Sequence, residues 1–97
     1  MRKITEQSIE AFLTNTEFKK ANMEVHATSH GTYMYLHRNL IAQKVDGVIS
    51  ISDGGWATNT TKERLNGFDF VQIYQSAGDW FLNDQLWDGS LISVGSI

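Results

Sequence analysis

The pattern of hydrophobic and polar positions divides the chain into a short helical part and a long β part. The apolar positions within residues 9–13 follow helical spacing and make one face of a predicted N-terminal helix. Thr5 is expected to cap this helix, and the polar run 14–16 to end it. The next segment, 17–21, is interpreted as a loop or as one further helical turn.

From residue 23 onward the period changes from helical to two. Met23 and Val25 alternate with Glu24 and His26, as in a strand with one buried face. The same alternation continues to residue 52 and predicts an antiparallel meander of about four strands. Within it, Arg38-Asn39 is expected to be a tight connection, and Asp46-Gly47 is a strong signal for a two-residue hairpin turn.

A second helix is predicted after the meander. Thr60 and Glu63 have the spacing of a capping box, and Asn66-Gly67 is a natural C-terminal stop, so this helix is short. Strand-like segments resume at 68–74 and end with an apolar run at 91–94. The predicted fold class is α+β: an N-terminal helix packed on an antiparallel β-meander, a short second helix, then a C-terminal antiparallel β segment. We expect a single domain over residues 1–97.

The amino-acid composition excludes several kinds of functional site. The chain has 97 residues and contains neither cysteine nor proline. The absence of cysteine excludes disulfides, thiol catalysis and cysteine-based zinc or iron–sulfur sites. No stretch approaches 18 apolar residues, and no apolar run follows the first residues, so neither a membrane span nor a signal peptide is predicted. We therefore expect an intracellular protein without membrane contact.

Charge is unevenly distributed along the sequence. The net charge is −3, but all eight Lys and Arg residues lie within residues 1–64, together with seven acids. Residues 65–97 contain four aspartates and no Lys or Arg. A broad basic footprint for nucleic acid is thus missing from the last third. Solvated aspartates on turns explain most of this asymmetry, with some steering toward a basic partner.

The most unusual stretch is 54–67, where hydroxyl, amide, basic and aromatic side chains gather around a predicted helix start. The candidate binding residues in it are Trp56, Thr58, Asn59, Thr61, Lys62 and Arg64. Backbone N–H groups at a helix start can hold an anion, the cations would add charge, and the tryptophan offers an anchor. The sequence is not a P-loop. A purely structural interpretation, in which these residues cap the helix and fill the core, remains open.

A second set of polar and aromatic residues lies on the predicted strands. Tyr33, Tyr35 and His37 are candidate members of the same binding face. His26, His30 and His37 lie within twelve residues, but strand spacing does not bring them to one metal ion, and we predict no metal site. Nucleophile and metalloprotease motifs are absent, so we predict no catalytic residues, no cofactor and no enzymatic activity.

Several motifs resemble a group of small phage and prophage proteins. Residues 36–42 read LHRNLIA and residues 55–67 read GWATNTTKERLNG. The end of the chain also fits, with WFLN at 80–83 and WDG at 87–89, so the resemblance covers residues 33–89. Arg38 stands where that group usually has glycine. The resemblance implies a phage or mobile-element origin and a site of action in the cytoplasm of the host cell.

Three functional hypotheses follow from these observations. The first is a non-enzymatic binder that inhibits a host protein complex, such as a defence system, in the manner of an anti-CRISPR protein. The alternative is a protein that binds a nucleotide, a phosphate or nucleic acid through the cluster between Trp56 and Asn66. The third is a structural or regulatory phage component that forms homo-oligomers.

Overall fold

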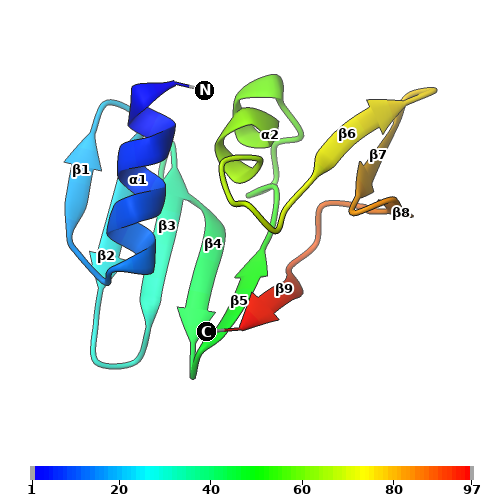
Figure 1. Cartoon of the computed structure of the whole chain (residues 1–97). Helices are drawn as coiled ribbons and strands as arrows, with labels where there is room; N and C mark the ends of the chain where they lie inside the picture. Colours follow the sequence, from blue (N-terminus) through cyan, green and yellow to red (C-terminus); the bar gives the residue numbers. More distant parts are fainter. Residues whose placement is uncertain (1, 97) are drawn as a thin grey trace.

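The computed structural model describes residues 2–96, which form two antiparallel sheets and two helices (Figure 1). The helices are α1 (Lys3–Leu13) and α2 (Asn59–Leu65). The strands are β1 (Phe18–Lys20), β2 (Met23–Ala27), β3 (Thr32–Leu36), β4 (Asn39–Val45), β5 (Val48–Ile51), β6 (Ile73–Ser76), β7 (Asp79–Leu82), β8 (Gln85–Leu86) and β9 (Ile92–Ser96). The predicted α+β class is confirmed.

The larger sheet has six strands in the order β1-β2-β3-β4-β5-β9. Its centre is the predicted meander, β2 to β5, in which each strand pairs with the next. Asp46 and Gly47 form the expected hairpin turn, with φ values of 52° and 78°. The connection before β4 uses His37 and Arg38, with φ values of 50° and 68°, so this turn lies one residue earlier than predicted.

One strand of the larger sheet was not predicted, and another was predicted to belong to a different group of strands. The segment predicted as a loop or a helical turn contains β1, in which Phe18 packs against the core while Lys19 and Lys20 are exposed. The C-terminal apolar run belongs to β9, which pairs with β5 and not with the second group of strands. That second group is the small sheet β6-β7-β8, which extends away from α1 in Figure 1.

Both helices contribute to one apolar core. α1 lies over β2 and β3 (Figure 1), and the inward side chains of the strands pack beneath it. Phe12 of α1 meets Phe68, which follows α2, edge to face at 5.5 Å between ring centroids. Phe68 and Leu65 are fully buried, so the second helix and the loop after it complete the cover of the sheet. Burial of this apolar surface is the main stabilising term of the fold.

The ends of α1 differ from the prediction. The helix begins after Arg2, and Thr5 is buried inside it, so the expectation that Thr5 caps the helix is wrong. At the other end, the Nζ of Lys44 on β4 donates to the backbone oxygens of Phe12 and Leu13, at 3.2 and 3.1 Å. α1 has no basic residue in its last turn, so Lys44 supplies the cation that its C-terminal carbonyls favour.

Candidate binding cleft

The start of α2 is fixed by threonine hydroxyls. The Oγ1 of Thr58 accepts a hydrogen bond from the Thr61 backbone N–H at 3.2 Å, and the Thr61 hydroxyl donates to the Trp56 carbonyl at 3.0 Å. The N-cap is therefore Thr58, and the predicted capping box of Thr60 and Glu63 is wrong. The helix ends at Leu65, before Asn66-Gly67, as predicted.

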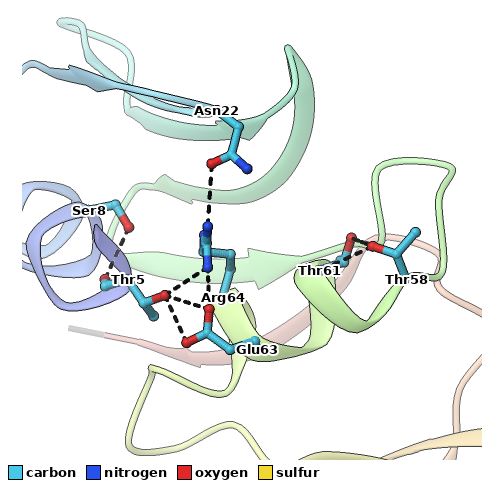
Figure 2. Close-up of polar contacts among 7 residues, drawn as sticks. All are labelled: Thr5, Ser8, Asn22, Thr58, Thr61, Glu63 and Arg64. Atoms are coloured by element: carbon cyan, nitrogen blue, oxygen red, sulfur yellow. Dashed lines mark hydrogen bonds and ion pairs between the residues drawn. The ribbon is translucent and has the colours of Figure 1, made fainter. Parts of the chain in front are cut away.

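Glu63 is used in a different way, as Figure 2 shows. The hydroxyl of Thr5 on α1 donates to the Glu63 carboxylate at 2.7 Å, and the Arg64 guanidinium donates to Thr5 Oγ1 at 3.1 Å. Arg64 also forms an ion pair with Glu63 and reaches the side-chain oxygen of Asn22 at 3.4 Å. These contacts join α1, α2 and the β1–β2 turn through buried and partly buried polar groups.

Arg64 is thereby removed from the accessible surface. Only 2% of it is exposed, and its Nε has no hydrogen-bond partner among residues 2–96. Thr61, another candidate binding residue, is also buried, at the N-terminus of the same helix. Both side chains hold the fold together in this conformation, and the positive charge of Arg64 is largely neutralised by Glu63.

The pKa of Glu63 reflects these neighbours. Its partial burial raises the pKa, but the hydrogen bonds from Thr5 and Arg64 and the guanidinium charge lower it by more. The net pKa therefore lies below its ordinary value of 4.5, and the carboxylate is ionised at neutral pH.

A cleft of about 490 Å³ lies beside the start of α2. We call it the Trp56 cleft, and it is lined by Leu36, His37, Asn39, Ile41, Asp53, Trp56, Thr58, Thr60 and Thr61. It brings together four of the predicted residues, namely His37, Trp56, Thr58 and Thr61. Trp56 is 66% exposed. An indole this exposed contributes little to the core, so it is available to a partner.

The other candidate residues lie elsewhere. Asn59 is exposed at the first position of α2, and the Nζ of Lys62 lies 5.8 Å from the centre of the Trp80 ring. Tyr33 and Tyr35 are half-buried on β3 and alternate with its buried residues, so they project from the sheet face opposite α1. They do not line the Trp56 cleft.

A second concave surface adjoins the first. We call it the acidic groove: it measures about 310 Å³ and is lined by Asp53, Ala57, Gly78, Asp79, Trp80, Leu86, Trp87, Asp88 and Gly89. Asp53 lines both surfaces, and its backbone N–H donates to the Gly89 carbonyl at 2.9 Å. Hydrogen bonds from Ser90 lower the pKa of Asp88, which is therefore ionised at neutral pH.

Asn39 and Asp53 line the Trp56 cleft but were not predicted from the sequence, although the order of the strands indicates that they lie close together. Asn39 begins β4, and Asp53 closely follows β5. In an antiparallel hairpin, residues before the first strand and after the second lie at the same end. The meander and its turn at Asp46-Gly47 thus place Asn39 and Asp53 near each other, beside the segment that carries Trp56.

Two classes of site are absent from the described part of the chain. Within residues 2–96, no three His, Asp or Glu side chains come together as metal ligands. Over the same residues, no helix is long and apolar enough to cross a membrane.

Comparison with known proteins identifies the family. Over residues 1–93 the sequence matches the family described as Kyanoviridae Gp96 protein. The chain belongs to this family. It is a phage protein, so the origin predicted from the motifs at 36–42 and 55–67 is confirmed. No curated protein and no solved structure matches the Gp96-family chain.

Proposed function

We propose that this phage protein is a non-enzymatic binder that inhibits a host protein complex, such as a defence system, through the Trp56 cleft. The observation that carries the proposal is the exposed indole of Trp56 at a concave surface. Tryptophan is enriched among residues that dominate binding energy, because it buries a large rigid area at a small entropic cost. A small phage protein that occupies such a surface on a host complex blocks it without chemistry of its own.

The same geometry favours a protein ligand over a phosphate. Phosphate binding at this cluster relies on the cations Lys62 and Arg64, but Arg64 is buried against Glu63 and Lys62 lies over Trp80. The Trp56 cleft is also lined by the carboxylate of Asp53, which repels an anion. Nucleotide binding is therefore the less favoured hypothesis.

Capture from host lysate tests the proposal. Tagged wild-type protein should retain one host protein complex in stoichiometric amount, and Trp56→Ala should lower its affinity for that purified complex roughly tenfold or more. Val48→Ala is the matched control, because Val48 is an exposed apolar residue at the opposite end of β5. Wild-type protein should also inhibit the activity of the captured complex, and Trp56→Ala should not.

Three results would count against the proposal. One is the absence of a captured complex from lysate in which host proteins are fully expressed. Another is equal binding by Trp56→Ala and wild type while circular dichroism shows both to be folded. The third is a stable homo-oligomer in light scattering that buries Trp56, which would favour the self-associating phage component.

A further inference from the structure

The acidic groove extends the Trp56 cleft into one continuous surface. Both are lined by Asp53, and the chain passes from the cleft to the groove between Trp56 and Ala57. An exposed apolar residue lies in each part: Trp56 in the cleft, and Leu86, 71% exposed, in the groove. A partner held by Trp56 is therefore placed beside the groove.

The charges along this surface have one sign. Asp53, Asp79 and Asp88 line it, and within the described residues none of its lining side chains is Lys or Arg. Lys62 brings a cation close to this surface, since its Nζ is 5.8 Å from the Trp80 ring centre. A single ammonium group against three carboxylates leaves the groove negative.

The groove also offers aromatic surface. Trp80 and Trp87 line it beside the carboxylates. Trp87 is held in place, because it is buried and its Nε1–H donates to the Ser90 carbonyl at 2.9 Å. Carboxylates next to an indole ring suit a guanidinium or ammonium group, and the Lys62 ammonium already lies over the Trp80 ring.

We propose that the acidic groove accepts a basic side chain, arginine or lysine, flanked by apolar residues on the surface of the partner protein. The inference rests on the proposed function and names the chemistry of the partner. The carboxylates of Asp79 and Asp88 pair with the cation, while Trp56 and Leu86 contact the apolar neighbours. Such charge complementarity sets specificity and speeds association.

A pair of peptides tests this chemistry without the partner. One is an acetylated and amidated peptide with a single arginine between leucines, and the other carries citrulline, the neutral isostere of arginine. In NMR titrations, the arginine peptide should shift the indole N–H signals of Trp56 and Trp80. The citrulline peptide should shift them much less, and added salt should weaken the arginine peptide's binding.

Substitutions test whether the arginine peptide binds at the acidic groove. Asp79→Asn together with Asp88→Asn should raise the Kd for the arginine peptide roughly threefold to tenfold, as expected for two partly exposed ion pairs. Asp46→Asn is the control, because it removes one negative charge from the far end of the β4–β5 hairpin and preserves the turn. Equal binding of both peptides, no indole shift, or an equal loss with Asp46→Asn would each overturn the inference.

The captured complex separates this inference from the proposed function. If Trp56→Ala abolishes capture and the double aspartate variant binds as wild type does, the partner is not basic at the groove, and the proposed function stands. If capture does not depend on Trp56, the proposed function fails, whichever peptide binds.

Discussion

The hydroxyl of Thr5 on α1 donates to the carboxylate of Glu63 on α2 at 2.7 Å, and these residues lie 58 positions apart in the sequence. Thr5 is fully buried, and it also accepts a hydrogen bond from the guanidinium of Arg64. One hydroxyl therefore joins the two helices and orients the only ion pair of α2 that the described residues contain. The helix that borders the Trp56 cleft is held in place from its far side.

Thr5→Val tests that link with a side chain of nearly the same shape. The variant should lower the free energy of unfolding by about 2 kcal/mol, because the partly buried Glu63 carboxylate and the buried Arg64 guanidinium each lose a partner. Urea denaturation measures the change. Thr16→Val, which alters an exposed hydroxyl after α1, should cost less than about 0.5 kcal/mol. Equal effects of the two variants would show that the Thr5 hydroxyl contributes nothing particular.

Arg64→Met removes the buried cation. We expect a loss of about 1–2 kcal/mol, because the partly buried Glu63 carboxylate loses its charge partner but keeps water and the Thr5 hydroxyl. The same substitution combined with Glu63→Gln should cost less than the sum of the two single changes. Thermal unfolding of the four proteins of this double-mutant cycle gives the coupling energy. Strict additivity would show that the ion pair does not couple the two residues.

Stability should depend on pH through Glu63. The folded-state pKa lies below the ordinary value of 4.5, so the unfolded chain takes up the proton first as the solution is acidified. The stabilisation is therefore fully present above pH about 4.5 and is lost as pH falls through the folded-state pKa. The difference in unfolding free energy between wild type and Glu63→Gln should be constant from pH 7 to 5 and then shrink. A difference that grows in acid would contradict this assignment.

Lys44→Met should loosen the end of α1. The ammonium group of Lys44 donates to two C-terminal carbonyls of the helix, and methionine keeps the apolar stem but not the donors. Hydrogen exchange should accelerate selectively in the last turn of α1, with a global loss of about 1 kcal/mol. Lys19→Met, at an exposed position of β1, should leave exchange in α1 unchanged.

Gly67→Ala should destabilise the protein by crowding α1. A Cβ at this position would collide with Ile9 Cδ1 and lie 2.7 Å from Cγ2 of the buried Thr5, so these side chains of α1 would have to shift. Overpacking of this kind costs about 1–3 kcal/mol. Gly55→Ala separates sterics from backbone strain, since a Cβ there meets nothing within 4 Å although φ is +89°. A greater loss for Gly55→Ala would contradict the close-approach explanation.

Hydrophobic alternation and turn residues predicted the strands and turns whose structure depends on neighbouring residues in the sequence. The period-two alternation located β2 to β5, and Asp46-Gly47 located their tightest turn. β1 has three residues, too few to show alternation, and its place at the sheet edge comes from Phe18 packing on the core. The pairing of Ile51 with Ile92 joins distant segments, and no local signal encodes it.

In the candidate site, too, the local sequence predicted some features, and contacts with distant residues set the others. The run from Thr58 to Thr61 offers four side chains able to cap a helix, and sequence alone did not select Thr58. Glu63 does not cap the helix, because its carboxylate pairs with the neighbouring Arg64 and accepts a hydrogen bond from Thr5, which is 58 positions away in the sequence. A signal for the burial of Arg64 was present: it follows Thr61 by three positions and precedes Leu65, so all three share the inward side of α2.

The pairing of Ile51 with Ile92 makes residues 52–91 an insertion into the edge of a sheet. Its two ends lie side by side in one ladder, so changes confined to its exposed residues need not displace the strands that flank it, whereas Leu65 and Phe68 within it belong to the core. Most lining residues of the cleft and the groove belong to this insertion, whereas α1 and the meander form the frame that carries it. Substitutions at exposed lining positions such as Trp56 can therefore change this surface while the strands that flank it keep their pairing.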